Sequence, residues 1–595
     1  MTGLCGWVGD AEPSTLARML ARIGHRGDRV DQALLPGAAL GYRFWSERPG
    51  HAAAIVRRGP RTIACAGELA PSVACPAEVI LDCLERGDPT DNALDGSFLA
   101  AVWDEDDASL RVVGDPFGTR SLYWVEHRGA VYFASELKQL LAIPGLPVEV
   151  DPSVIHNYLT FSFVAGDRTP IRGVHRVPPG HVSELRGGAW IDRPYLRLTE
   201  RVDRTIDDDA AAAMIDSLGR AAVEARLPSA GRERVGLYLS GGLDSSTIAC
   251  WLGELGLRPP AYSLDFGERS VEREQAALVA ESLGLSLSWV DASPEAVLPI
   301  LRDLAWRMDL PLGDGVTGPH YLLAAAASRD GLTAVFNGEG GDQLFGGWNN
   351  KPMIAAEVFT PAPTLRSRAQ AQLQTYHRFG GLEDELLSED FAAAIAAERE
   401  ARGDHDERLE LLERELGSPT IETFLGHLRQ ADIAIKGCDN IQPRAERIAG
   451  SFGLDVRSPL FDRALTEASF TLHPRHKLRG VVEKFALKRA VTGRLPDEIV
   501  WRRKSGMCVP TSQWMLGPMR DLAHDLLGPE AAARRGMFRA DYLTRLRNDR
   551  DHSSELRPRR VGEKLWALAM LELWLRAFVD GRGQRPDHAG EENFG

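Results

Sequence analysis

A short turn rich in glycine and serine constrains this chain most, because it joins an apolar run at residues 235–239 to a helical pattern that continues to about residue 255. Glycines let a ligand approach the backbone closely, and a helix N-terminus offers free N–H groups to an anion. The sequence therefore predicts a strand, a phosphate-binding turn and a helix. The residues of the turn are Leu239, Ser240, Gly241, Gly242, Leu243, Asp244, Ser245 and Ser246.

Two readings of this turn stay open when it is taken alone. Asp244 is placed to hold Mg²⁺ beside phosphate oxygens, which are hard ligands of the kind that this ion prefers. In the alternative, the turn only starts a helix, with Asp244 or Ser245 as the N-cap. A Walker loop is excluded, because the Gly-Lys-Ser/Thr sequence is missing from the turn.

The rest of the pattern divides the chain. Short β-type runs at 61–65, 97–103, 110–113 and 130–133 predict an α+β first half. After residue 235, apolar runs at 261–264 and 287–290 alternate with helical stretches, which is typical of a parallel sheet wound with helices. The expected units are a domain at 1–196, a linker and helix at 197–230, a second domain at 231–580 with a helical insertion at about 353–417, and a flexible tail at 581–595.

Composition excludes several classes of protein. The 595 residues carry a formal net charge of −14, which argues against a nucleic-acid backbone as the main partner. The seven cysteines are scattered and never spaced C-x-x-C, so they predict neither disulfides nor a zinc site and suit a reducing compartment. No run approaches the roughly 18 apolar residues of a membrane span, and the N-terminal segment does not read as a signal peptide. We therefore expect a cytoplasmic protein.

A second loop, acidic and rich in glycine, follows the apolar run 333–336 and extends from Asn337 to Trp348. In a wound parallel sheet both loops would lie at the carboxyl ends of strands, where such sheets bind ligands. Asp244 and Asp342 are then placed to share the Mg²⁺ of an ATP molecule. Glu339 is left to act as a base or to orient the attacking group.

Together these two motifs resemble the synthetase domain of the asparagine synthetase family, whose members are ATP pyrophosphatases of the adenine-nucleotide α-hydrolase-like (PP-loop) fold. The match continues in residues 455–462, 483–490 and 495–506. The resemblance implies that Ser240 to Ser246 bind pyrophosphate and that Asp244 and Asp342 hold Mg²⁺. It also implies that Leu239, Leu264 and Gly338 lie near adenosine.

Lys484 corresponds to the family's lysine that stabilises the chemistry of the acyl-adenylate. An ammonium group there would offset charge that develops on the carboxylate and the α-phosphate. By itself, Lys484 would otherwise be read as a solvated lysine on a helix.

The first half resembles the family's class II glutaminase domain of the Ntn-hydrolase fold, but its reactive groups are replaced. Thr2 stands at the position of the nucleophilic cysteine, and Cys5 is expected to be a buried small hydrophobe. Phe44 replaces the arginine that grips the glutamine carboxylate, Ala66 replaces an oxyanion-hole asparagine, and Pro76 replaces the aspartate that pairs with the ammonium group. Loss of one oxyanion donor typically costs about 10²–10³ in rate, so an inactive glutaminase is predicted.

Without ammonia from glutamine, the substrate itself must supply the amine. The helical insertion, Glu339 and the form of the acidic loop look most like a lasso peptide macrolactam synthetase (cyclase). This resemblance implies ATP and Mg²⁺ as cofactors, a precursor peptide as substrate, and a leader peptidase and a leader-binding protein as candidate partners. The alternatives are a β-lactam-synthetase-like or asparagine-synthetase-like enzyme acting on a small carboxylate, a glutamine-dependent amidotransferase, and a non-catalytic scaffold.

Overall fold

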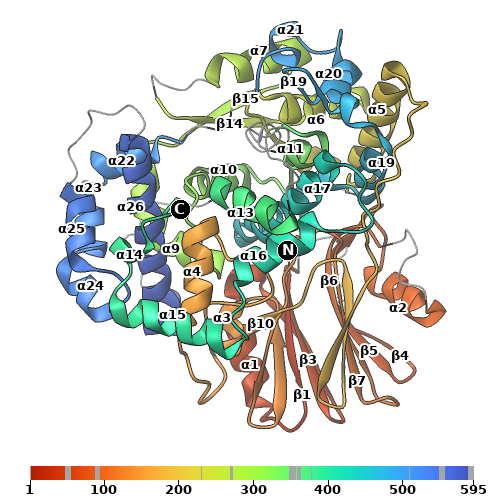
Figure 1. The fold of residues 1–595 in the computed structure, drawn as a ribbon. Coiled ribbons are helices and arrows are strands. Elements are labelled where there is room, and N and C mark those ends of the chain that lie inside the picture. Colours follow the sequence, from red (N-terminus) through yellow and green to blue (C-terminus); the bar gives the residue numbers. More distant parts are fainter. Residues whose placement is uncertain are drawn as a thin grey trace.

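The computed structural model describes residues 2–46, 55–87, 94–228, 231–267, 272–347, 357, 364–376, 378–504, 506–507, 509–548 and 557–586. Figure 1 shows a strand-rich N-terminal part beside a larger part in which helices surround a second kind of sheet. Among the described residues, no helix combines the length and the apolarity needed to cross a bilayer.

Two antiparallel sheets of six strands form the N-terminal part. The first has the order β10 (His175–Arg176), β8 (Tyr123–His127), β9 (Ala130–Ala134), β1 (Gly3–Val8), β3 (Ala38–Phe44) and β2 (Arg29–Leu35). The second has the order β12 (Ala189–Pro194), β11 (His181–Arg186), β7 (Ser109–Gly114), β6 (Gly96–Asp104), β5 (Arg61–Leu69) and β4 (Ile55–Arg58).

Alternate residues of these strands make a sandwich. Leu40 and Tyr42 of β3 pack with Ala64 of β5 and Leu99 of β6 in the core between the sheets, because side chains along a strand point to opposite faces in turn. Helices α1 (Ser14–Ala21) and α2 (Pro76–Arg86) cover the two outer faces. The α+β prediction for this half is confirmed.

A five-stranded parallel sheet is the centre of the second part. Its strand order is β15 (Leu287–Asp291), β14 (Ala261–Asp265), β13 (Val235–Tyr238), β16 (Ala334–Phe336) and β17 (Asp455–Arg457). From β13 the chain first moves outward through β14 and β15, and it then returns to the other side of β13 with β16 and β17. This reversal creates a topological switch point between β13 and β16, where sheets of this type bind ligands.

Helices surround the parallel sheet and extend away from it (Figure 1). Before the insertion the chain forms α3 (Leu137–Leu140), which packs on β8 and β9 of the N-terminal part. It then forms α4 (Pro152–Phe161), α5 (Asp208–Ala225), α6 (Leu243–Glu254), α7 (Arg273–Leu283), α8 (Pro294–Val297), α9 (Leu301–Met308), α10 (Thr317–Arg329) and α11 (Gly341–Phe345). The insertion contributes α13 (Leu365–Tyr376), α14 (Glu383–Leu386), α15 (Glu389–Ala401) and α16 (Glu407–Leu416).

A long π-helical segment, η4 (Asp432–Ile441), connects α17 (Phe424–Ala431) to α18 (Gln442–Ser451). The chain then forms α19 (Arg463–Thr471), the hairpin β18 (Leu478–Arg479) and β19 (Val482–Glu483), α20 (Phe485–Val491), α21 (Asp497–Val500), α22 (Thr511–Leu516), α23 (Arg520–Leu526), α24 (Pro529–Arg535), α25 (Ala540–Asn548) and α26 (Arg557–Leu575).

Charged side chains are buried where the two parts meet. Arg26 of the N-terminal part donates two hydrogen bonds to Glu446 of α18, at 2.9 and 3.1 Å. The fully buried Nζ of Lys138 lies 2.6 Å from the carboxylate of Asp309, and Arg447 of α18 lies 3.1 Å from the same side chain. Buried charges are tolerated only when they are paired in this way, so the two parts depend on each other for charge compensation.

The predicted insertion and the predicted tail are each only partly covered by the described residues. The insertion is helical from residue 365 onward, whereas most of 348–363 lies outside the described residues. The tail differs from the expected flexible segment over 581–586, because the Trp306 indole donates a hydrogen bond to the Gly583 carbonyl at 3.0 Å and Arg585 lies 3.2 Å from Asp303. Residues 587–595 lie outside the described part of the chain.

Candidate active site

The two loops predicted from the sequence meet at the switch point. The turn after β13 leads into α6, and the acidic loop after β16 leads into α11. A Cβ atom at Gly338 would lie 2.4 Å from the Ser245 nitrogen, and one at Gly341 would lie 2.3 Å from Oδ1 of Asp244. Only glycine allows so close an approach to the backbone at Ser245 and to the side chain of Asp244, so both glycines are needed to bring Asp244 and Asp342 together.

Lys484 lies between these two aspartates. Its Nζ is 2.5 Å from Oδ2 of Asp244 and 2.5 Å from Oδ1 of Asp342, and the residue is 2% exposed. Burial disfavours an ammonium group, but the two carboxylates outweigh that effect and raise the pKa of Lys484. A positive φ of 52° at this non-glycine residue, immediately before α20, directs the side chain. Strain of this kind is commonly found at functional sites.

Two lysines, Lys484 and Lys504, keep Asp342 ionised. Burial would raise the pKa of this carboxyl group, but Lys484 and Lys504 lower it to about 2. Lys504 Nζ lies 3.0 Å from the second oxygen, Oδ2. Asp342 is therefore a carboxylate at any physiological pH.

These carboxylates fit a magnesium ion that ATP brings with it. Oδ1 of Asp244 is buried and has no hydrogen-bond partner among the described residues. Within the same part of the chain, no group of three or more Asp, Glu, His or Cys side chains could hold a metal ion alone. Mg²⁺ is usually held by one or two carboxylates together with substrate phosphates, so Asp244 and Asp342 are suited to Mg–ATP rather than to a permanent ion.

Glu339 faces the cavity beside a second ion pair. Its Oε1 accepts a hydrogen bond from Arg444 at 2.6 Å, and Arg444 also donates to Asp314 at 2.7 Å. Oε2 of Glu339 is buried and has no hydrogen-bond partner among the described residues. Burial raises the pKa of Glu339, although Arg444 opposes the rise. One carboxylate oxygen is thus fixed while the other remains available to accept a proton.

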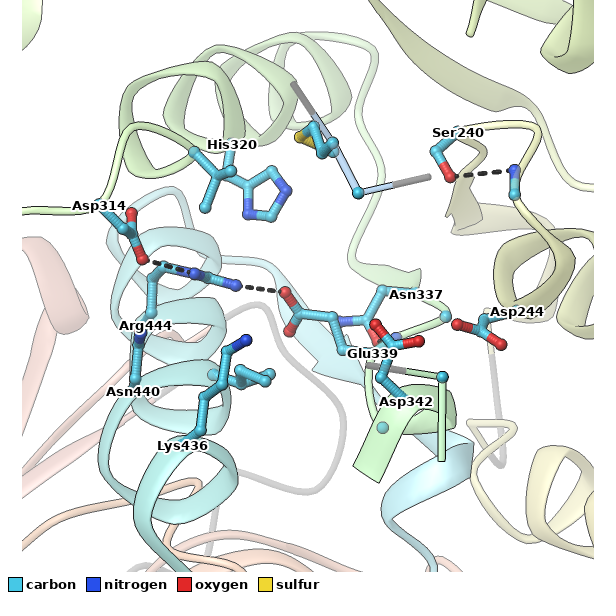
Figure 2. Close-up of a pocket in the computed structure, with 18 of the residues that line it drawn as sticks. Ser240, Asp244, Asp314, His320, Asn337, Glu339, Asp342, Lys436, Asn440 and Arg444 are labelled. Carbon is cyan, nitrogen blue, oxygen red and sulfur yellow. Dashed lines mark hydrogen bonds and ion pairs between the residues drawn. The ribbon is translucent and has the colours of Figure 1, made fainter. Parts of the chain in front are cut away.

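One cavity of about 1010 Å³ contains all of these groups. Figure 2 shows Ser240 and Asp244 on one side of it, Arg444 and Asp314 on the other, and Glu339 between them. Beyond Glu339 the walls come from the end of α4, from α13 of the insertion and from α26. Sites for single ligands usually span about 300–1,000 Å³, so there is room for a nucleotide and a second substrate.

Most residues predicted for nucleotide binding, metal binding or catalysis line this cavity. They are Leu239, Ser240, Gly242, Leu243, Asp244, Ser245, Leu264, Gly338, Glu339, Asp342 and Lys484. Two others do not line it. Ser246 is fully buried on the inner side of α6, and a Cβ atom at Gly241 would lie 2.4 Å from the Ala276 nitrogen of α7, so this glycine serves packing.

Sequence motifs did not point to Arg444, Asp314 and Lys436, which also line the cavity. Lys436 lies in η4 and Arg444 lies in α18. Along these two segments a polar residue recurs at every fourth position among apolar residues. That periodicity predicts a helix with one polar face, but not where the face points.

The four positions predicted to be altered in the glutaminase site differ in their surroundings: Thr2 and Ala66 are buried, whereas Phe44 and Pro76 are partly exposed. Thr2 is 2% exposed, and its Oγ1 has no hydrogen-bond partner among the described residues. Phe44 stacks on Tyr42 with ring centroids 5.7 Å apart. Ala66 is buried in β5, and Pro76 is the first residue of α2. Cys5 is fully buried in β1, and burial raises the pKa of its thiol, as expected for a residue that serves packing.

Comparison with known proteins identifies the family to which this chain belongs. A family model described as asparagine synthase matches residues 214–576, and a glutamine amidotransferase domain matches residues 70–196. The chain belongs to the asparagine synthase family. It is 23% identical over 507 residues to asparagine synthetase [glutamine-hydrolyzing] 1 of Bacillus subtilis, covering 82% of this chain and 78% of that protein.

Other relatives include a second protein named as an asparagine synthetase and one named as an amidase. A putative asparagine synthetase [glutamine-hydrolyzing] of Mycobacterium bovis is 25% identical over 522 residues, covering 82% of this chain and 77% of that protein. Amidase chry2 of Gibberella zeae is 31% identical over 279 residues, covering 43% of this chain and 40% of that protein. Family membership therefore does not fix the substrate.

Proposed function

We propose that this protein is an ATP-dependent amide synthetase that forms a ring within a peptide. It adenylates the side-chain carboxylate of an Asp or Glu residue in a precursor peptide, and the peptide's N-terminal amine attacks to give a macrolactam. This is the reaction of a lasso peptide cyclase. The observation that carries the proposal is the position of Lys484, held between Asp244 and Asp342 in a cavity with room for two ligands.

In the first step, a carboxylate oxygen of the peptide attacks the α-phosphorus of ATP. The bond from that phosphorus to the bridging oxygen breaks, and pyrophosphate leaves. Lys484 is fixed beside the turn that would hold the phosphates, so its charge stabilises the transition state without rearrangement. When bound by Asp244 and Asp342, Mg²⁺ would neutralise charge on the departing pyrophosphate.

In the second step, the amine attacks the activated carbonyl, a C–N bond forms, and AMP leaves. The attacking nitrogen must lose a proton, and Oε2 of Glu339 is the available acceptor. Arg444 holds the other oxygen and so keeps the carboxylate oriented. Binding both ends of one peptide in the same cavity makes the reaction intramolecular, which is a large advantage.

Two observations favour an amine from the substrate over ammonia from glutamine. The side chains at positions 44, 66 and 76 are phenyl, methyl and pyrrolidine groups, which donate no hydrogen bond to a glutamine. In addition, the cavity extends past Glu339 to α13 and α26, well beyond the nucleotide loops. A leader peptidase and a leader-binding protein are the partners that a precursor peptide would require.

A second candidate is glutamine- or ammonia-dependent amidation of a small carboxylate. It is favoured by the relatives named asparagine synthetase [glutamine-hydrolyzing], which match 82% of this chain. This reaction would use the same Lys484 and Glu339 but would require a nitrogen source outside the substrate.

The test combines purified enzyme, ATP and Mg²⁺ with peptides that carry a free N-terminus and one internal Asp or Glu, and in parallel with aspartate plus glutamine. We expect AMP, pyrophosphate and a peptide lighter by one water, with no glutamate released from glutamine. Formation of ADP in place of AMP would overturn the adenylation chemistry. Aspartate-dependent release of glutamate from glutamine would establish the second candidate instead.

A further inference from the structure

One wall of the cavity carries polar side chains at every fourth position. They are Asp432, Lys436 and Asn440 in η4 and Arg444 in α18, and all four line the cavity. A π-helix of ten residues is rare, and π-helical turns are often found at functional sites. In this protein the segment aligns four polar groups opposite the phosphate turn.

Two of the four groups already have partners that fix them. Oδ2 of Asp432 accepts a hydrogen bond from Gln343 at 2.8 Å, and Arg444 pairs with Glu339 and Asp314. These contacts account for the outer members of the row without a ligand.

The two inner members are different. Lys436 is exposed to the cavity, and its ammonium group forms no hydrogen bond or ion pair with any described residue. Figure 2 shows this group pointing toward the Glu339–Arg444 pair. Asn440 is only 6% exposed, yet its Oδ1 has no hydrogen-bond partner among the described residues. A buried amide oxygen without a partner is costly unless an N–H or O–H group of a ligand or a water molecule donates to it.

The position of Lys436 indicates which anion it would bind. The two lysines beside the aspartates are already neutralised, because Lys484 pairs with Asp244 and Asp342 and Lys504 pairs with Asp342. The phosphate turn lies on the opposite side of the cavity (Figure 2), so the phosphates of the nucleotide are held away from Lys436. An uncompensated ammonium on the acyl-substrate side suits a carboxylate that is not the one being activated.

We propose that Lys436 binds a second, non-reacting carboxylate of the acyl substrate, while Oδ1 of Asn440 accepts a hydrogen bond from an N–H group of the same substrate. Holding the second carboxylate would determine which carboxylate faces the α-phosphate of ATP. The inference rests on the proposed function, because it assumes that an acyl substrate occupies this side of the cavity. The carboxylate has two possible sources, namely the α-carboxylate of a free amino acid or the C-terminus of a peptide.

The experiment compares paired substrates that differ only in the second carboxylate. One pair is aspartate and its α-amide, and the other is a peptide with one internal Asp and either a free or an amidated C-terminus. Carboxylate-dependent exchange between ATP and pyrophosphate is measured for the wild type, Lys436→Gln and Lys436→Arg. Arg193→Gln, an exposed change on β12 with the same loss of charge, is the matched control.

We expect the wild type to prefer the free carboxylate in one pair by roughly tenfold to a hundredfold in kcat/KM, as for a charge-assisted hydrogen bond. Lys436→Gln should remove the preference, Lys436→Arg should restore part of it, and the KM for ATP should stay constant in both. The pair that shows the preference identifies the source of the carboxylate.

Two outcomes would overturn the inference, and only the second would also overturn the proposed function. If Lys436→Gln keeps the preference, or slows both members of a pair equally, the inference fails while the synthetase proposal stands. If the wild type exchanges pyrophosphate with none of these substrates, the proposed function fails and the inference fails with it.

Discussion

Replacing Lys484 by methionine tests the centre of the site most directly. The two carboxylate oxygens beside Nζ each lie 2.5 Å from it, so they are at most twice that distance, 5.0 Å, apart. Two like charges at that separation repel by about 3 kcal/mol at an effective dielectric constant of roughly 20. Lys484→Met should therefore destabilise the folded protein and raise the pKa of Asp342.

The same change has two further consequences that can be measured. Loss of the fixed cation should slow the exchange of pyrophosphate into ATP by about 10²–10³. Because the two carboxylates then lack a counter-charge, added Mg²⁺ should raise the melting temperature of Lys484→Met more than that of the wild type.

Lys488→Met is the control for this experiment. It removes a buried lysine of α20, the helix that begins directly after Lys484. Lys488 donates hydrogen bonds to Glu483 and to the Arg502 carbonyl rather than to either aspartate. This variant should lose stability without gaining a dependence on Mg²⁺. An exchange rate for Lys484→Met within about threefold of the wild type would refute the role assigned to this ammonium group.

Three other outcomes follow from the same geometry. Thr2→Ala should leave pyrophosphate exchange unchanged and glutamate release absent, whereas a glutaminase activity lost in this variant would restore Thr2 as a nucleophile. Glu339→Gln should keep exchange but lose the amide product, because only the second step needs a proton acceptor; a parallel loss of both would assign Glu339 to substrate binding. For Asp342, the pKa is lowered from 3.8 to about 2, so its contribution to stability is present above pH 4 and is lost as the pH falls toward 2. Melting curves of the wild type and Asp342→Asn should converge over that interval, and a constant difference would contradict the assigned pKa.

Local patterns in the sequence predicted the elements that hold the nucleotide loops. The apolar run at 235–239 contains β13, and the run at 333–336 contains β16. The conformation of a turn depends on neighbouring residues, so glycines and serines between a strand and a helix predict the turn directly from the sequence. The collinear motif around Lys484 was also visible in the sequence, although its αL backbone and its contact with both aspartates were not.

The substrate side of the cavity could not be predicted in the same way. Asp314 precedes α10, Lys436 lies in a π-helix, and Tyr376 ends a helix of the insertion. These residues meet only because α10, α13 and η4 converge in three dimensions. Helical periodicity reports which face of a helix is polar, but not which distant segment that face meets.

The ion pairs between Arg26 and Glu446, and between Lys138 and Asp309, restrict how this chain could be shortened. A fragment that begins after residue 196 would lack Arg26 and Lys138. Glu446 would then lose the guanidinium group that binds both of its oxygens, whereas Asp309 would keep Arg447. Removing one partner of a buried ion pair costs about 3–5 kcal/mol. The free energy of unfolding of the remaining fragment would fall by an amount close to the whole stability of many small proteins. The N-terminal part therefore stabilises the synthetase part, and this role does not depend on whether it releases ammonia.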